Sequence, residues 1–264
     1  MLRREKMNQS ERRIYLIKEL LEERNEYSEG CIPSSEEKQK SLLRALMNIR
    51  KAKEISPEFL SVQDEYLKTE IEKKGIVDAS LLPEIRKGIV LWQGDITLLK
   101  CDAIVNAANS RMTGCYSPNH RCIDNCIHTY AGVQLRLKCA EIMNLQGIPE
   151  PAGRAKITPA YNLPSRYVIH TVGPIIMGDV TPADEEKLAS CYRECLKTAE
   201  ENGLESIAFC CISTGVFCFP NRRAAEIAVK TVEDCLNAGS SIRKVIFNVF
   251  KEEDREIYTE LLSR

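Results

Sequence analysis

Apolar residues in the first part of the chain recur at helical spacing. Between Ser10 and about Tyr27 they lie three and four residues apart, which places them on one face of a helix. Ser34 and Glu37 have the spacing of a capping box, in which the N-cap serine and the glutamate each bond to the other's backbone. This pattern predicts a second helix with Ser34 as its N-cap.

A third helix is predicted from Ser56 and Pro57, because proline at the first helical position already has a helical φ. Gly75 is well placed to end this helix. Three short helices make a thin core by themselves. We therefore expect residues 1–80 to form a helical extension docked on the rest of the chain; an independent small bundle is the alternative.

From Gly88 onward the pattern changes to alternating strands and helices. Short apolar, β-branched runs predict strands at Ile89–Trp92, Ala103–Asn106, Lys156–Thr158, Tyr167–Thr171, Ser206–Ile212 and Val245–Val249. Amphipathic runs predict helices at Ile123–Glu141, Ala183–Asn202, Asn221–Asn237 and Glu252–Ser263. Such alternation is typical of an α/β fold with a mixed, mostly parallel sheet between helices. We assign this fold to residues 81–264.

The composition is that of a globular protein, with 44% hydrophobic and 28% charged residues and a net charge of −1. Charge is not segregated: residues 1–88 hold 18 basic and 17 acidic residues, and the rest of the chain holds 19 and 21. The basic stripe of a nucleic-acid-binding protein is missing. The sequence has neither a run of about 18 apolar residues nor a signal-peptide pattern. We expect a cytoplasmic monomer with no nucleic-acid or membrane partner.

Two of the twelve cysteines and one of the three histidines lie close together in sequence. Cys115, His120 and Cys122 form a C-x4-H-x-C pattern, whereas most cysteines are scattered through predicted strands and helices. Scattered cysteines without a secretory signal argue against a disulfide framework. Two thiolates and one imidazole suit zinc, and three protein ligands are typical of a catalytic zinc with one open position. The alternatives are Cys126 as a fourth ligand, or a polar loop with incidental cysteines.

Other polar residues flank this loop. Asn106 and Asn109 lie where a predicted strand ends, and open α/β sheets bind ligands at the carboxyl ends of their strands. Asp124 and His128 are four residues apart and project from one face of the next predicted helix. Without further context the asparagines are turn residues, Asp124 is a first-turn acid favoured by the helix dipole, and His128 is a half-buried structural histidine.

Two further segments have the composition of ligand-binding turns. Ser213-Thr214-Gly215 connects an apolar strand to a helix, and the backbone N–H groups of such a loop can bind an anion. Taken alone, this turn is most simply a connection. Asp95 follows the first strand of the α/β part, and its spacing alone indicates an N-cap.

Taken in order, these segments resemble the macrodomain family, an ADP-ribose-binding α/β module. The matching segments are Gly94–Thr97, Asp102–Asn109, Ile123–Gly132, Tyr167–Pro174 and Ile212–Phe217. They cover roughly Gly88 to the C-terminus and imply a three-layer α/β/α sandwich. The Cys/His loop stands where the ordinary MacroD pattern has a glycine run. This departure, together with the N-terminal helices, resembles the zinc-dependent macrodomain hydrolases.

The resemblance implies a role for each candidate residue. Asp95 would accept a hydrogen bond from the adenine amino group, and Ile96 would line that pocket. Asn106 and Asn109 would contact the ribose beside the scissile bond, and Asp124 and His128 would contact the substrate and its attacking water. The diphosphate and the distal ribose would be held by one loop, which consists of Ser213, Thr214, Gly215, Val216 and Phe217. Cys218 stands where related families often have glycine.

The implied activity is zinc-dependent hydrolysis that removes mono-ADP-ribose from modified proteins, at ester-linked aspartate or glutamate. Zn²⁺ could polarise a substrate oxygen or lower the pKa of a bound water from about 15.7 to about 7, and the sequence does not choose between the two. A module that binds ADP-ribose without cleaving it is the main alternative. A redox or metal sensor is disfavoured, because no resolving cysteine is paired with the loop.

Overall fold

The computed structural model describes residues 7–28 and 30–263 of the 264-residue chain. Its α-helices are α1 (Gln9–Glu22), α2 (Glu36–Ile49), α3 (Pro57–Lys74), α4 (Ile123–Ala131), α5 (Val133–Gln146), α6 (Pro182–Glu201), α7 (Asn221–Asn237) and α8 (Glu252–Leu262). Its strands are β1 (Val77–Asp78), β2 (Ile89–Gln93), β3 (Leu99–Lys100), β4 (Ala103–Ala107), β5 (Ala155–Pro159), β6 (Tyr167–Thr171), β7 (Ser206–Phe209) and β8 (Lys244–Val249). Two short 3-10 helices are η1 (Ala79–Leu81) and η2 (Ile96–Leu98).

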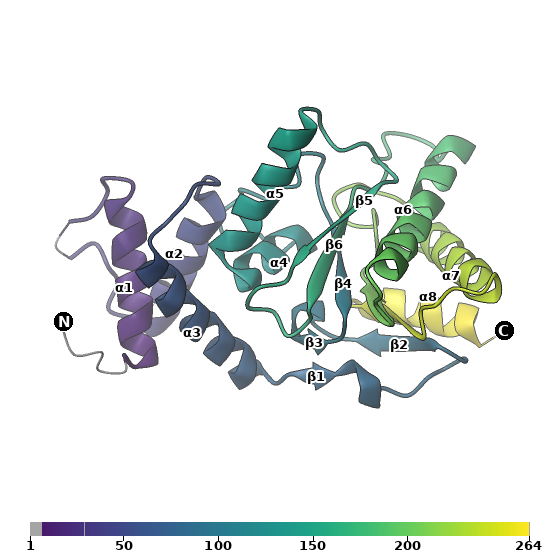
Figure 1. The fold of residues 1–264 in the computed structure, drawn as a ribbon, viewed down its shortest axis with the longest axis horizontal. Coiled ribbons are helices and arrows are strands. Elements are labelled where there is room, and N and C mark those ends of the chain that lie inside the picture. Colours follow the sequence, from purple (N-terminus) through teal and green to yellow (C-terminus); the bar gives the residue numbers. More distant parts are fainter. Residues whose placement is uncertain (1–6, 29, 264) are drawn as a thin grey trace.

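The main sheet has the strand order β2-β8-β7-β4-β6-β5. All neighbouring pairs are parallel except β5 with β6, so the predicted mixed, mostly parallel sheet is confirmed. Helices α4, α6 and α8 each pack on strands of this sheet, which completes an α/β/α sandwich (Figure 1). Because β2, β8, β7, β4 and β6 run in the same direction, the loops that follow them meet along one side of the sheet. We call this side the carboxyl edge.

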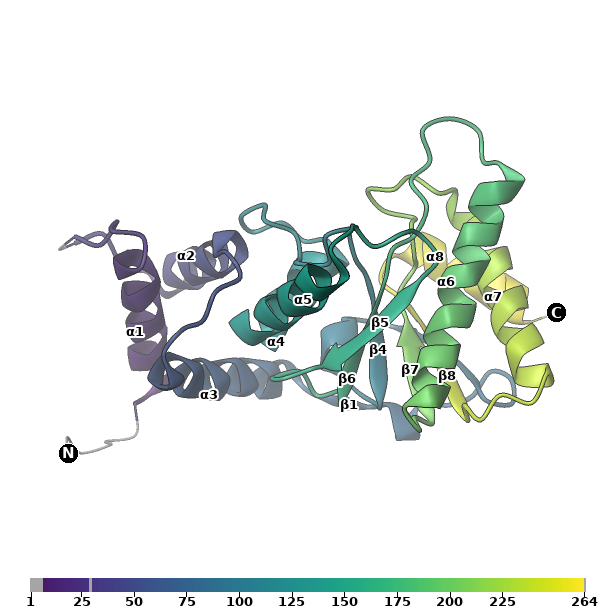
Figure 2. The ribbon, with the colours of Figure 1, turned by 45° about the horizontal axis from the view of Figure 1, so that its top comes forward.

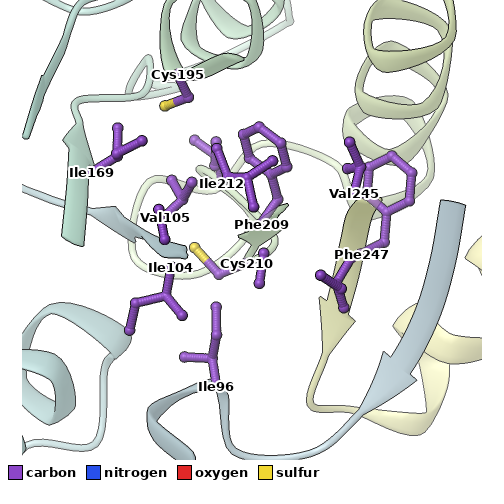
Figure 3. Close-up of a cluster of buried hydrophobic side chains, with 14 of the residues drawn as sticks. Ile96, Ile104, Val105, Ile169, Cys195, Phe209, Cys210, Ile212, Val245 and Phe247 are labelled. Carbon is purple, nitrogen blue, oxygen red and sulfur yellow. The ribbon is translucent and has the colours of Figure 1, made fainter. Parts of the chain in front are cut away.

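The core of the sandwich lies where the central strands are covered by helices. Side chains such as Ile104, Phe209 and Phe247 are fully buried there, together with Cys195 of α6 (Figure 3). Each large apolar side chain that is buried contributes about 1.5–3 kcal/mol to the free energy of folding. Burial raises the pKa of Cys210 to about 12, so this cysteine acts as a small apolar residue. All twelve cysteines are free thiols.

The three N-terminal helices share a small core and also contact the sandwich. That core consists of Leu16, Ile17, Leu20, Leu21, Leu43, Leu46, Met47, Phe59, Tyr66 and Leu67, with Val133 added from α5. Helices α2 and α3 contact α4, and Figure 2 shows the bundle beside α4 and α5. Ile71 at the end of α3 already belongs to the main core, and β1 pairs with β3. The three helices therefore form a small bundle and pack on the sandwich at the same time.

Three predicted boundaries are wrong, each for a local reason. The N-cap of α2 is Ser35, whose hydroxyl accepts the Lys38 amide, and not Ser34. The predicted helix 123–141 is broken at Gly132, which has φ +99° and where a Cβ would lie 2.6 Å from side-chain atoms of Gln63 and Gln134. The strand predicted to reach Ile212 ends at Phe209.

None of the helices in residues 7–28 and 30–263 has the length and apolar character needed to span a membrane.

Candidate functional site

The residues singled out in the sequence lie along the carboxyl edge in a fixed order. Asp95 follows β2, the 213–217 loop follows β7, and Asn109 follows β4. In the sheet, β8 and β7 separate β2 from β4. Three strand spacings correspond to roughly 14 Å. The edge is therefore a strip long enough to contact both ends of an extended ligand.

Asp95, at one end of this strip, is the N-cap of η2. Its Oδ1 accepts hydrogen bonds from the Thr97 amide at 3.0 Å and the Thr97 hydroxyl at 2.6 Å. No donor among the described residues reaches Oδ2, which leaves that oxygen for a ligand. Ile96 is only 2% exposed and its side chain packs in the core (Figure 3), so it offers almost no surface to a ligand.

The 213–218 loop, which we call the phosphate loop, is a closed turn. The Phe219 amide donates to the Ser213 carbonyl at 3.0 Å, and the Cys218 amide donates to the Gly215 carbonyl at 3.0 Å. The amides of residues 214–217 find no acceptor in the described part of the chain, which is the property of an anion site. Cys218 has φ +57°, the left-handed conformation that favours glycine. Cys218 thus adopts a backbone conformation that is usual for glycine, the residue often found at this position in related families.

A second loop supports the phosphate loop from β6. The Ile176 amide donates to the Phe217 carbonyl at 2.9 Å. Gly173 approaches so closely that a Cβ there would lie 2.0 Å from the Ser213 hydroxyl oxygen. Gly173 is therefore required for the loop packing, although its position in the sequence gives no sign of this.

Asp124 lies in the first turn of α4 between two asparagine amides. Its Oδ1 accepts from Asn106 Nδ2 at 2.9 Å and its Oδ2 accepts from Asn109 Nδ2 at 3.0 Å. Burial raises the pKa of Asp124 to about 6. The two hydrogen bonds from the asparagines favour the carboxylate and lower this pKa, but their effect is smaller than that of burial. Asn106 is fully buried while Asn109 is partly exposed. The structure thus places Asn106 behind the carboxylate and Asn109 toward the outer side.

His128 is packed beneath the loop that precedes α4. Its Nε2 lies 3.6 Å from Asp124 Oδ1. A Cβ on Gly114 would lie 2.8 Å from the His128 ring, so the loop backbone rests directly on the imidazole. Burial lowers the pKa of His128 well below its ordinary value. The ring is therefore neutral and supports both Gly114 and Asp124.

His128 also belongs to a buried Cys/His group that the sequence spacing does not reveal. Its other members are Cys139 of α5 and His170 of β6, and the ligand atoms lie within 4.8 Å of one another. His170 Nε2 is 2.9 Å from the Thr158 hydroxyl, and His170 Nδ1 is 3.1 Å from Asn106 Nδ2. Burial lowers the pKa of His170 to about 3. These contacts fit a structural role for His170.

Cys115, His120 and Cys122 are brought together by the loop between β4 and α4, which we call the metal-ligand loop (residues 115–122). Their ligand atoms lie within 4.8 Å of one another. Cys115 Sγ is 3.4 Å from His120 Nδ1, and a tetrahedral zinc with ordinary Zn–S and Zn–N bonds separates such atoms by about 3.5 Å. Cys126 is not part of this group, because its sulfur faces Arg44 of α2 at 3.4 Å. The donor set fits zinc with three protein ligands.

The environment of Cys122 determines which form of its side chain is stable. Cys122 is the N-cap of α4, and its sulfur accepts the Asn125 amide at 3.4 Å. Burial raises the pKa of Cys122 to about 12. A thiolate at this position therefore requires a compensating positive charge, which a bound metal ion supplies.

Asn125 is a residue of this site that the sequence reasoning missed. It is fully buried, and its Nδ2 donates to the carbonyls of Cys115 at 3.4 Å and Ser117 at 3.1 Å. In the sequence, the position of Asn125 three residues after the helix N-cap is the sole indication of its role. This position is equally compatible with a side chain that caps the helix and with one that contacts the loop. Asn125 fixes the metal-ligand loop to α4.

Comparison with known proteins gives one consistent result. The profile of the Macro domain family matches residues 105–228. A protein-ADP-ribose hydrolase of Treponema medium is 57% identical over 261 residues, which cover 97% of this chain and 100% of that protein. A protein-ADP-ribose hydrolase of Staphylococcus aureus strain MRSA252 is 52% identical over 252 residues, with 95% and 94% covered.

Solved structures give the same fold. An Oceanobacillus iheyensis macrodomain variant with ADPR has a TM-score of 0.63 and 38% identity, with 69% of this chain and 95% of that chain covered. The Trypanosoma brucei macrodomain in complex with ADP-ribose has a TM-score of 0.64 and 30% identity, with 83% and 94% covered. The predicted three-layer fold is therefore confirmed as that of solved macrodomains.

Proposed function

The chain belongs to the macrodomain family of protein-ADP-ribose hydrolases, and from this membership we propose a zinc-dependent enzyme that removes mono-ADP-ribose from modified proteins. The bond it cleaves is an ester to aspartate or glutamate. The observation that carries the zinc dependence is the group formed by Cys115, His120 and Cys122. This group is separated by one residue in sequence from Asp124, which the two asparagine amides hold in place.

Most of the ligand is held away from the metal-ligand loop. The free amides of residues 214–217 in the phosphate loop bind the diphosphate next to Ser213, and Val216 and Phe217 contact the distal ribose. Asp95 accepts a hydrogen bond from the adenine amino group through Oδ2, beside Ile96. At the other end, Asn109 contacts the proximal ribose. These contacts follow the order of β2, β7 and β4 along the sheet.

The reaction adds water across the ester bond between the anomeric carbon and the acceptor carboxyl group. It yields ADP-ribose and a free carboxylate on the protein. Zn²⁺ bound by the three ligands would supply Lewis acidity, toward either a substrate oxygen or a water molecule. Asp124 orients the ribose or the attacking water by accepting a hydrogen bond. Asn106 fixes the carboxylate from behind, and neutral His128 keeps Gly114 and Asp124 in place.

A reader module that binds ADP-ribose without cleaving it is the competing function. The phosphate loop and Asp95 serve a reader and a hydrolase equally well, so they do not separate the two. The group of Cys115, His120 and Cys122 close in sequence to an oriented Asp124 carboxylate favours the hydrolase, because a reader needs neither.

The proposal is tested by metal analysis of the purified protein combined with hydrolysis assays. We expect about one zinc per chain and release of ADP-ribose from proteins modified at aspartate or glutamate. Proteins with N-linked ADP-ribose serve as the matched control substrate and should remain modified. A zinc-free protein that still releases ADP-ribose would reject the zinc dependence. A protein that binds ADP-ribose tightly but releases none from either substrate would leave the reader as the function.

The proposal extends to organisation of the chain. We propose that residues 1–80 are a helical extension docked on the macrodomain, and that the protein acts as a cytoplasmic monomer without nucleic acid or membrane as a partner. The even distribution of charge supports the absence of a nucleic-acid partner. Sedimentation at micromolar concentration should give a mass near the 29.9 kDa of the chain, and twice that mass would contradict the monomer.

A further inference from the structure

Arg44 of α2 contacts the metal-ligand loop from far away in the sequence. Its Nη2 donates to the His120 carbonyl oxygen at 2.9 Å across a separation of 76 residues. The same nitrogen donates to Asn125 Oδ1 at 2.9 Å and lies 3.4 Å from Cys126 Sγ. One guanidinium group therefore fixes the backbone of a metal ligand to the first turns of α4.

Asn48, one turn further along α2, makes a second link of the same kind. Its Oδ1 accepts the Asn119 amide at 2.9 Å, and its Nδ2 donates to the Thr129 hydroxyl at 2.8 Å. Asn119 has φ +56° and also donates from its side chain to the Ser41 hydroxyl at 3.1 Å. The turn just before His120 is thus held in an unusual conformation by two residues of α2.

Arg136 of α5 connects the end of α2 to the beginning of the same loop. Its Nη1 donates to the carbonyls of Asn48 at 2.6 Å and Arg50 at 2.5 Å, which the helix leaves without internal partners. Its Nη2 donates to the Cys115 carbonyl at 3.4 Å. The position of α2 is therefore coupled to both ends of the metal-ligand loop.

We propose that α2 is the scaffold of the metal-ligand loop, and that Arg44 and Asn48 are positioning residues for the metal ion. This inference rests on the proposed zinc site. The loop has no regular structure and is largely exposed from Tyr116 to Arg121, so it cannot keep three ligands within 4.8 Å by its own packing. Contacts from α2 supply that order before the metal binds. Helix α2 of the N-terminal bundle thereby supports the metal centre without supplying a ligand.

The test is the zinc affinity of the full-length protein, measured by competition with a chromophoric chelator. Arg44→Met keeps the aliphatic stem but removes the hydrogen bonds to the loop. The matched control is Arg12→Met, which removes an equally half-buried arginine of the same bundle, paired with Glu65 of α3 and remote from the loop. Loss of an outer-shell contact weakens metal binding by roughly 10- to 100-fold. We expect that loss for Arg44→Met and unchanged affinity for Arg12→Met.

Two further readouts separate a positioning role from general destabilisation. ADP-ribose affinity should be the same in both variants, because the phosphate loop does not contact α2. Arg44→Lys should recover part of the zinc affinity, since an ammonium group can reach one of the acceptors. Equal zinc affinity in wild type and Arg44→Met, or equal loss in both methionine variants, would overturn the scaffold role while the zinc site stands.

A second variant covers the case in which Arg44→Met does not fold. Ser41→Ala removes only the contact with the Asn119 side chain, and we expect a smaller fall in zinc affinity at an unchanged melting temperature. Unchanged zinc affinity in Ser41→Ala would then overturn the scaffold role. A wild-type protein that binds no zinc would instead reject the proposed metal site, and the scaffold role with it.

Discussion

The phosphate loop and the metal-ligand loop, which follow neighbouring strands β7 and β4, are built in different ways. The phosphate loop is made of backbone: its shape comes from turn hydrogen bonds between neighbouring residues and from the close approach of Gly173. The metal-ligand loop presents side chains, and its backbone is held by α2, α4 and α5. Binding and cleavage of ADP-ribose should therefore depend on different residues and be separable by mutation.

The largest separation is expected from the metal ligands. His120→Ala or Cys122→Ala should abolish hydrolysis, because two remaining ligands no longer hold zinc firmly. ADP-ribose affinity should largely survive, since Asp95 and the phosphate loop are untouched. Calorimetry and a hydrolysis assay on the same preparation check this. Parallel loss of affinity, hydrolysis and melting temperature would instead show that the metal only holds the fold together.

A smaller but still large effect is expected at Asp124. Asp124→Ala should slow hydrolysis about 100-fold or more, which is the usual contribution of a positioned acid or base. Zinc content should not change, because Asp124 is not one of the three ligands. Metal analysis of the variant is the control. Loss of zinc together with activity would make Asp124 a ligand.

The phosphate loop should show the reverse behaviour. Gly215→Glu places a bulky, negatively charged side chain where the loop amides face an anion. If one charge-assisted hydrogen bond of about 1.5–3 kcal/mol is lost, ADP-ribose binding weakens by roughly 10- to 100-fold. Zinc affinity should stay at the wild-type value. Gly215→Ala, which adds a methyl group where no protein atom lies within 4 Å, is the matched control and should weaken binding less. Wild-type affinity in Gly215→Glu would place the diphosphate elsewhere.

The smallest effect is expected at Cys218. Its left-handed conformation costs a non-glycine residue about 1 kcal/mol. Cys218→Gly should recover part of this cost, offset by the greater flexibility of glycine in the unfolded chain. Thermal unfolding should therefore show a change of at most about 1 kcal/mol, with hydrolysis and zinc affinity unchanged. A large destabilisation would mean that the Cys218 side chain itself supports the loop.

Local sequence patterns predicted the elements that are determined locally. The bounds of β6 and α7 are as predicted. A buried strand is recognisable as a short apolar run, and an amphipathic helix as apolar residues at helical spacing. The candidate ligands Cys115, His120 and Cys122 could be recognised in the sequence because they fall within eight residues. Whether they and the other candidate residues act as proposed is still a prediction.

What the sequence could not predict depends on contacts between distant segments. Arg44 reaches the metal-ligand loop across 76 residues, and no spacing rule connects the two. The break at Gly132 arises from side chains of α3 and α5 that fill the place of a Cβ, whereas the local pattern is continuous. The apolar run after Phe209 looks like strand but is already turning toward Ser213. In each case tertiary packing decides the structure.

The central claim is that zinc is needed for cleavage and not for binding. The direct test removes the metal from the wild-type protein with a chelator and confirms by its melting curve that the sample is still folded. ADP-ribose affinity and hydrolysis are then measured on that sample, before and after zinc is returned. We predict retained affinity, lost hydrolysis and recovery with zinc. Full hydrolytic activity in the metal-free sample would contradict the claim.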